Sequence, residues 1–441
     1  MTAPTGPESA GTGYQASLGT VLREWGRIGC IGFGGPPAHI ALLRRLCVDD
    51  RGWLDPREFE DAISACNLLP GPASTELAIY CAWRVRGRPG ALAGGAAFIV
   101  PGLICILALS VLFLAGSPPL WVRGLGAGAG AAVAAVAIQA GWSLLMASWT
   151  RAAARRARWV VYLLAGGTAA ATIGPWLVLV LLGCGVAELA IRHAAREKGE
   201  GTGKPGPVTH GVVAVPVAAG LALAREHAGG LARAMWAKAH AGGLVRAAAH
   251  AGGLARVGVA AAGGGVLASV AWVAFKVGAL SFGGGFVIIP LMRADAVGRG
   301  WMTSGQFLNA VALGQITPGP VVQTVAAVGY AAAGVGGGLL AALVAFSPSF
   351  AFVLGGARYF GSLRGSKRAQ AFLEGSGPAA IGAILGSAIP LTAALGEAWQ
   401  YAVLAGAVVL LLGLRRGVVF TLVAAAAVGL AVALAGGPLP H

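Results

Sequence analysis

Long apolar stretches separated by short polar connectors dominate the chain, and this pattern predicts a bundle of membrane-embedded helices. Several stretches carry no charge and approach the ~20 residues that a helix needs to cross a bilayer. The run at 159–191 is too long for one crossing and contains Gly174-Pro175, so we expect a helical pair there. The expected segments before this run are 18–40, 62–83, 91–115 and 125–149. The segments expected later in the chain are 263–292, 307–330, 339–356, 378–395, 399–414 and 418–434.

The same glycine and proline motifs occur twice, 248 or 249 residues apart. The first copies are Phe33-Gly34-Gly35, Arg51-Gly52-Trp53 and Pro70-Gly71-Pro72. The second copies are Phe282-Gly283-Gly284-Gly285, Arg299-Gly300-Trp301 and Pro318-Gly319-Pro320. A long repeat in an apolar chain predicts a duplicated membrane bundle. Because proline removes backbone donors and blocks a continuous helix, the motifs also predict broken helices.

Composition supports this class of protein. Hydrophobic residues make up 57% of the chain, charged residues make up 11%, and the mean hydropathy is +0.76. Residues 1–17 are polar and lack Lys and Arg, so we expect a mobile tail rather than a cleaved signal peptide. The six cysteines form no C-x-x-C motif, which argues against a disulfide framework or a zinc site, and we expect no cofactor. We therefore expect an all-α polytopic membrane protein.

Basic residues are placed differently in the two halves. Short cytoplasmic loops collect Lys and Arg. The basic loops are 84–88 and 151–158 in the first half, and 358–368 and 415–416 in the second. The second-half counterparts of the first two loops, 331–338 and 396–398, carry no Lys or Arg. This mirrored pattern predicts two homologous halves arranged as inverted repeats.

Inversion requires an odd number of crossings before the second half. Two alternatives satisfy this requirement. The first segment of each half could dip into the membrane and return, as its charges Arg23, Glu24 and Arg27 suggest, or an additional span could lie near 208–224. The sequence leaves both open.

The composition divides the chain into four regions, which are residues 1–17, the first repeat at 18–191, a linker at 192–256 and the second repeat at 257–441. The linker is basic and contains three similar His-Ala-Gly-Gly pieces, beginning at His227, His240 and His250. Few carboxylates and no cysteines accompany these histidines. We therefore interpret the region as a low-complexity cytoplasmic linker rather than a metal site.

The helix breaks predict an anion-binding centre. Non-helical backbone at membrane depth persists where it lines a cavity or is buried in protein. A helix that restarts after a break presents unpaired N–H groups carrying about half a positive charge, and glycines let an anion approach them. Arg27 and Lys276, each six residues before the phenylalanine of its motif, would add one fixed cation per half. The candidate substrate-binding residues are Arg27, Gly34, Gly35, Asn67, Pro70, Gly71, Pro72, Ser74, Thr75, Lys276, Gly283, Gly284, Gly285, Gln315, Thr317, Pro318, Gly319 and Pro320.

Each feature also has a simpler interpretation. The glycine and proline motifs could serve only helix packing and kinking. Arg27 and Lys276 could extend to the lipid headgroups. Glu76, in an apolar segment, is either a proton carrier or half of an ion pair with Arg84 or Arg27. The Gly-Ala alternation at 126–131 is expected to be a close-packing helix face.

The motifs around both breaks follow a known pattern. They are Phe33-Gly34-Gly35-Pro36 with His39-Ile40, residues 69–80, Phe282-Gly283-Gly284-Gly285 with Ile289-Pro290, and residues 312–320. Together they closely resemble the paired motifs of the chromate ion transporters, the CHR family, in its long two-domain form. The resemblance implies a multi-pass carrier of the cell inner membrane that exports chromate from the cytoplasm and gives chromate resistance. It implies a proton gradient or membrane potential as the driving force.

Other functions remain as alternatives. A transporter of sulfate or another oxyanion, working by uptake or exchange, would use the same site because sulfate matches chromate in charge and shape. An enzyme is not expected, since the spans contain no nucleophile paired with a base and no Gly-x-Ser-x-Gly elbow. The expected partners are the oxyanion and the lipid bilayer but no nucleic acid, and a homodimer is compatible with the pattern.

Overall fold

The computed structural model describes residues 16–67, 69, 71–114, 118–152, 155–172, 177–200, 263–281, 286–357 and 366–440. Within these residues the regular secondary structure is entirely helical, as predicted. Several sequence predictions lie outside the described residues. They concern residues 1–15, the linker beyond residue 200, the stretch 208–224, Pro70, Gly283, Gly284 and Gly285.

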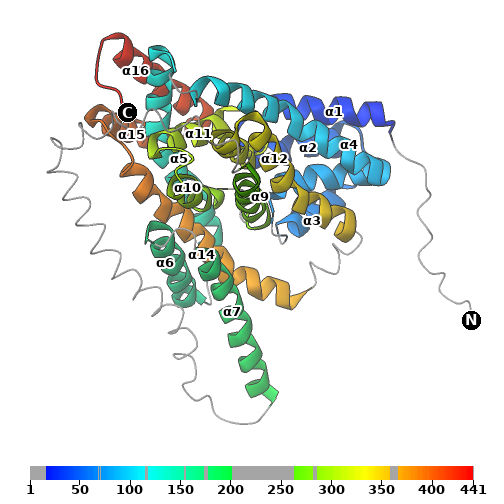
Figure 1. The fold of residues 1–441 in the computed structure, drawn as a ribbon. Coiled ribbons are helices and arrows are strands. Elements are labelled where there is room, and N and C mark those ends of the chain that lie inside the picture. Colours follow the sequence, from blue (N-terminus) through cyan, green and yellow to red (C-terminus); the bar gives the residue numbers. More distant parts are fainter. Residues whose placement is uncertain are drawn as a thin grey trace, which may run out of the picture.

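The described helices follow the same order in the two halves (Figure 1). The first half contains α1 (Leu18–Ile31), α2 (Pro36–Arg44), the π-helix η1 (Arg45–Asp50), α3 (Pro56–Cys66), α4 (Ala73–Phe113), α5 (Leu120–Arg151), α6 (Arg156–Thr172) and α7 (Leu177–Glu200). The second contains α9 (Gly263–Ala279), α10 (Ile288–Gly298), α11 (Ser304–Ile316), the 3-10 helix η5 (Val321–Gln323), α12 (Thr324–Gly356), α14 (Lys367–Thr392), α15 (Ala398–Val408), the π-helix η7 (Val409–Gly413) and α16 (Val418–Leu434). Taken in order, α1 to α7 correspond to α9, α10, α11, α12, α14, α15 and α16.

Five helices of the described residues are long and apolar enough to cross a membrane. They are Ala73–Phe113, Leu120–Arg151, Leu177–Ala194, Val321–Gly356 and Lys367–Thr392. Shorter apolar helices are Gly265–Ala279, Ala398–Gly413 and Val418–Leu434. The chain is therefore a multi-pass membrane protein.

The two longest helices each contain a sharp turn at equivalent positions. In α4 the turn is at Arg86 and Gly87, where φ is −142° and +67°, and in α12 it is at Ala333 and Gly334, where φ is −149° and +65°. Each helix is thus divided into a first and a second arm by its turn. In α4 the two arms pack antiparallel, since a Cβ atom at Gly94 would lie 2.5 Å from the Cβ atom of Ala82. Both turns fall where the sequence predicts connectors.

α3 and the first arm of α4 form a helical hairpin with the first Pro-Gly-Pro break at its tip. Glu58, near the start of α3, forms an ion pair with Arg84, near the end of the arm, and accepts a hydrogen bond from Tyr80 at 3.3 Å. The expected segment at 62–83 is therefore two helices, because the chain turns at the predicted break and returns. α11 and the first arm of α12 repeat this contact, since a Cβ atom at Gly314 would lie 1.9 Å from the Thr324 hydroxyl oxygen.

The first segment of each half also enters the bundle and returns. Trp25 on α1 stacks on Trp53 after η1, with ring centroids 6.1 Å apart, and Arg51 lies 2.8 Å from the carboxylate of Glu24. The tip of this hairpin is the loop between α1 and α2. In the second half, Arg299 after α10 donates a 3.3 Å hydrogen bond to Ser269 on α9.

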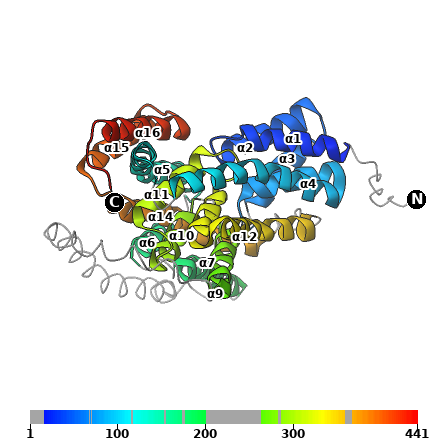
Figure 2. The ribbon, with the colours of Figure 1, turned by 45° about the horizontal axis from the view of Figure 1, so that its top comes forward.

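The halves interlock through their last helices. α6 and α7 pack against α14 of the other half, whereas α15 and α16 pack against α5 (Figure 2). Glycines permit these close approaches, since a Cβ atom at Gly128 would lie 2.1 Å from the carbonyl oxygen of Ala425. The predicted packing face at 126–131 is thus confirmed.

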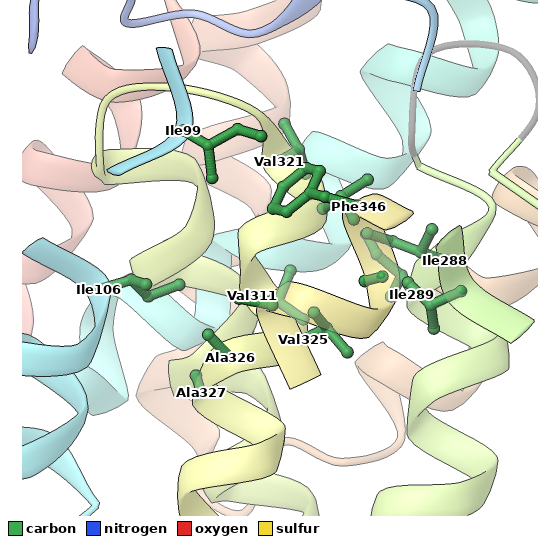
Figure 3. Packing of buried hydrophobic residues seen from close by; sticks show 14 of the residues in the cluster. Ile99, Ile106, Ile288, Ile289, Val311, Val321, Val325, Ala326, Ala327 and Phe346 are labelled. Atoms are coloured by element: carbon green, nitrogen blue, oxygen red, sulfur yellow. The ribbon is translucent and has the colours of Figure 1, made fainter. Parts of the chain in front are cut away.

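The second arms of α4 and α12 cross the centre side by side in opposite directions. Gly95 lies against Phe350, and Leu107, further along α4, lies against Gly338, which comes earlier in α12. One large apolar core joins the two halves there. Figure 3 shows Ile99 and Ile106 of α4 packed near Val311, Val325 and Phe346 of the second half.

Candidate functional site

The hairpin tips of the two halves meet at the centre of the bundle. The Gly319 N–H, at the second break, donates to the carbonyl oxygen of Gly32, at the end of α1, over 3.0 Å. His39 Nε2 lies 2.9 Å from the same oxygen, and His39 Nδ1 lies 3.3 Å from the Ser74 hydroxyl at the start of α4. A carbonyl oxygen only accepts, so His39 donates from Nε2 and accepts from Ser74 at Nδ1. These bonds connect the α1–α2, α3–α4 and α11–α12 hairpins.

Two helices begin at these tips with N–H groups and without a side-chain cap. They are α4 after Pro72, and η5, which leads into α12, after Pro320. The third helix that begins there, α2, starts with Pro36 and Pro37, which have no N–H group to offer. The first N–H groups of a helix have no partner within the helix and carry partial positive charge. The arrangement therefore favours a bound anion at the tips.

Buried polar side chains around the tips lack hydrogen-bond partners among the described residues. The unpartnered atoms are Thr75 Oγ1, both carboxylate oxygens of Glu76, Ser281 Oγ, Gln315 Nε2, Gln323 Oε1 and Ser349 Oγ. An unsatisfied buried polar group costs about 1–3 kcal/mol. Such a group is common where a ligand, an ion or water is bound.

Glu76 lies directly at the first tip. A Cβ atom at Gly71 would lie 2.1 Å from Glu76 Oε1 and 3.3 Å from Ser349 Oγ of α12. The second tip likewise packs against α4 of the first half, since a Cβ atom at Gly102 would lie 2.0 Å from the carbonyl oxygen of Pro318. Each break therefore faces the second arm of the other half.

The two predicted cations occupy different environments. Arg27 is exposed on the surface of α1. Lys276 on α9 forms a 2.5 Å ion pair with Asp295 on α10, and Arg299 lies 3.4 Å from the same carboxylate. The charge of Lys276 is thus neutralised by Asp295 in this structure, so the two predicted cations are not equivalent here.

The repeated Arg-Gly-Trp turns anchor the hairpins. Arg51 lies 5.6 Å from the ring centroid of Trp53, and Arg299 lies 5.6 Å from that of Trp301. Each arginine also pairs with an acid on the preceding hairpin, Glu24 in the first half and Asp295 in the second. These residues hold the bases of the hairpins, far along the chain from the tips.

The remaining predicted site residues do not all lie at the hairpin tips. Gly34 and Gly35 have φ of +99° and +74°. Thr317 donates to the carbonyl oxygen of Leu313 at 2.9 Å, so its hydroxyl is already engaged. Asn67 is exposed at the end of α3 and lines a separate cavity. The buried residues at the breaks are Gly71, Pro72, Ser74, Thr75, Gln315, Pro318, Gly319 and Pro320.

His39 and Ser349 are absent from the predicted site, and Gln323 is a further polar residue at the tips. His39 is a lone histidine in an apolar segment, and Gln323 and Ser349 are polar residues within apolar helices. Gln323 donates from Nε2 to the carbonyl oxygen of Ile99 at 2.8 Å. Polarity in an apolar helix was the available signal, but only the fold brings Ser349 of α12 to the first break.

Comparison with known proteins agrees with this architecture. The family model described as "Chromate transporter" matches residues 19–189 and 268–430, which suggests two halves. A chromate transport protein of Pseudomonas aeruginosa is 30% identical over 84% of this chain and 80% of its own length. A chromate transport protein of Cupriavidus metallidurans is 29% identical over 89% of this chain and 88% of its own length. No solved structure matches the chain. The chain therefore belongs to the chromate transporter family of membrane transporters and is not an enzyme.

Proposed function

We propose that the protein exports chromate from the cytoplasm and thereby gives chromate resistance. One observation carries the proposal: the uncapped N-termini of α4 and η5 and unpartnered buried polar groups, among them the hydroxyls of Thr75 and Ser349, gather at the crossing of α4 and α12. A tetrahedral dianion accepts hydrogen bonds on every oxygen and matches this set of donors. The names of the relatives support chromate as the substrate.

Glu76 couples transport to protons in this proposal. Its carboxyl group is fully buried at the first tip. A carboxylate beside a dianion is repelled by it, whereas a protonated carboxyl donates a hydrogen bond. Binding of the anion and proton occupancy of Glu76 are therefore linked. A dianion that leaves with one proton carries a net negative charge, so the membrane potential, negative inside, drives export in this proposal.

Sulfate is the second candidate substrate, because the same donors suit any tetrahedral dianion. Labelled chromate flux into everted vesicles, with and without excess sulfate and an uncoupler, tests the proposal. We expect uptake that the uncoupler abolishes and that sulfate inhibits weakly. Sulfate transport in preference to chromate would identify a sulfate carrier, and absence of both fluxes would contradict the proposal.

We further propose that the halves are inverted repeats with re-entrant hairpins. Support comes from the opposite directions of the second arms of α4 and α12 and from the mirrored loop charges. In this arrangement the α4 turn and the α14 start are cytoplasmic, and the α12 turn is external. The four predicted regions, including a linker at 192–256, remain part of this proposal.

The re-entrant hairpins determine how many times the chain crosses the membrane before the second half begins. Each hairpin returns to its own side, so α1 to α7 cross the membrane an even number of times. Because α9 runs opposite to α1, the proposed inversion places the end of α7 and the start of α9 at opposite membrane faces. Of the two alternatives that the sequence leaves open, this arrangement favours the additional span near 208–224.

Reporter tags test this topology. Tags at Gly87 and Gly417 are expected to report the cytoplasm, and a tag at Gly336 the opposite side. If the tags at Gly87 and Gly336 report the same side of the membrane, the inverted arrangement is contradicted.

A further inference from the structure

A cavity of about 600 Å³ lies between α3 and α14, outside the hairpin tips. α5, α6 and α7 complete its walls. Ser64 and Asn67 of α3 line one side, and Ser376 and Ile384 of α14 line the other. Asn67 caps the end of α3, a few residues before the first break, so this wall of the cavity lies close along the chain to the first tip.

Arginines dominate the charge of this cavity. Arg151, Arg155 and Arg158 line it together with Glu188 and Glu374. Glu188 is almost fully buried and lies 3.3 Å from Arg155 and 3.4 Å from Arg158. Arg192 of α7 adds a fourth guanidinium, 3.1 Å from Glu188. Four arginines thus face two glutamates, which leaves an excess of positive charge.

The ion pairs of Glu374 are more exposed to solvent than those of Glu188. Its carboxylate pairs with Arg155 and Arg192, but its side chain is 42% exposed, against 2% for Glu188. An exposed carboxylate is readily displaced, because water and salt screen its interactions. An incoming anion can therefore replace Glu374 on these two guanidinium groups.

Ser376 gives a second, independent sign of a ligand. It is 3% exposed, lines the cavity on α14, and its hydroxyl has no hydrogen-bond partner among the described residues. A buried hydroxyl beside an excess of guanidinium groups is a donor suited to an oxyanion.

The equivalent interface in the other half is closed. There α11 packs on α5, and a Cβ atom at Gly126 would lie 2.8 Å from the side-chain amide of Asn309. Gln400 of α15 donates to the carbonyl oxygen of Ala127 at 3.0 Å. The cavity is therefore not a general feature of the repeat, and its arginines lie on the face that the loop charges identify as cytoplasmic.

We propose that this cavity is a loading site for a tetrahedral dianion on its way from the cytoplasm to the hairpin tips. Arg155 and Arg158 bind the anion, Ser376 donates to it, and Glu374 competes with it for Arg155. The inference rests on the proposed oxyanion transport and adds a second site to it. A lipid phosphate offers the same chemistry, but the position of Asn67 in the cavity wall, close along the chain to the first break, favours a soluble ion.

Opposite substitutions on one ion pair test the proposal. Sulfate and chromate binding to the purified protein is measured by calorimetry, alongside the KM of chromate flux. Glu374→Gln is expected to tighten binding and lower KM about three- to tenfold, and Arg155→Gln to weaken both by a similar factor. Glu60→Gln, which also removes an exposed glutamate paired with an arginine, Arg44, is the matched control and should change neither.

The outcomes separate this site from the proposed function. Thermal unfolding is measured for each variant, and a shared loss of stability with unchanged affinity would show a purely structural ion-pair cluster and overturn the loading site. Loss of sulfate binding when phosphatidylglycerol is added to the detergent would also overturn it, because lipid would then occupy the cavity. A wild-type protein that neither binds nor moves either anion would instead contradict the transport proposal itself.

Discussion

The buried polar atoms at the tips distinguish ligand binding from helix packing at the scale of single residues. Thr75, Ser349 and Glu76 are all fully buried, yet their side-chain oxygens have no partner among the described residues. Packing alone would favour apolar side chains at such positions. Their presence favours the proposal that a polar species occupies the crossing during the transport cycle.

Thr75→Val tests this interpretation, because the substitution preserves shape and removes only the hydroxyl. We expect chromate affinity to fall about tenfold with little loss of folded protein, since the hydroxyl bonds to the anion rather than to the protein. Thr421→Val is the control, because Thr421 is equally buried but donates to the carbonyl oxygen of Gly417. Equal effects of the two variants on chromate affinity would refute the assignment.

Glu76→Gln separates anion binding from proton coupling. Glutamine keeps the size of the side chain and can donate to the anion, but it cannot exchange a proton. We expect chromate binding and flux driven by the membrane potential to persist, while the dependence of the flux on the pH difference across the membrane is lost. An unchanged dependence on the pH difference in vesicles carrying this variant would exclude Glu76 as the proton carrier.

At the scale of elements, the hairpin rather than the crossing helix is the repeated unit. The sequence correctly indicated the breaks, the duplication and the connectors at Gly87 and Gly334. It did not indicate that α3 returns along α4, because hydrophobic periodicity reports which face is buried and not which helix covers it. The Lys276–Asp295 pair was missed for the same reason, since its partners are on separate helices joined by the α9–α10 connection.

Gly34→Ala tests whether the tip backbone itself binds the anion. Gly34 has φ of +99°, and an added Cβ would meet only the Ala38 methyl, at 3.6 Å. The substitution therefore strains the backbone by about 1–2 kcal/mol without a clash. Gly334→Ala at the α12 turn is the control, because φ there is +65° and the surrounding space is open.

We expect both glycine variants to lose similar stability, while only Gly34→Ala weakens chromate binding, about tenfold. Affinity is measured by calorimetry and normalised to protein that remains monodisperse in detergent. If both variants lose chromate affinity to the same extent, the glycine at the tip serves helix packing and does not bind the anion.

At the scale of the whole molecule, the asymmetry between two equivalent interfaces suggests how transport proceeds. The α3–α14 interface holds a cavity, whereas the α11–α5 interface is closed around Asn309. Exchange of these two arrangements between inverted halves would expose the tips first to one side of the membrane and then to the other. In this scheme the structure corresponds to the state in which the cavity lined by Arg151, Arg155 and Arg158 is open.

Cysteine labelling tests this exchange in a background without the native cysteines. In everted vesicles, a membrane-impermeant thiol reagent is expected to label Asn67→Cys, which lines the cavity, and not Asn309→Cys, which is packed against α5. Right-side-out vesicles energised in the presence of sulfate, which does not oxidise thiols, should show the reverse pattern. Because alternating access closes one interface as the other opens, simultaneous labelling of both positions from one side would instead indicate a continuous pore.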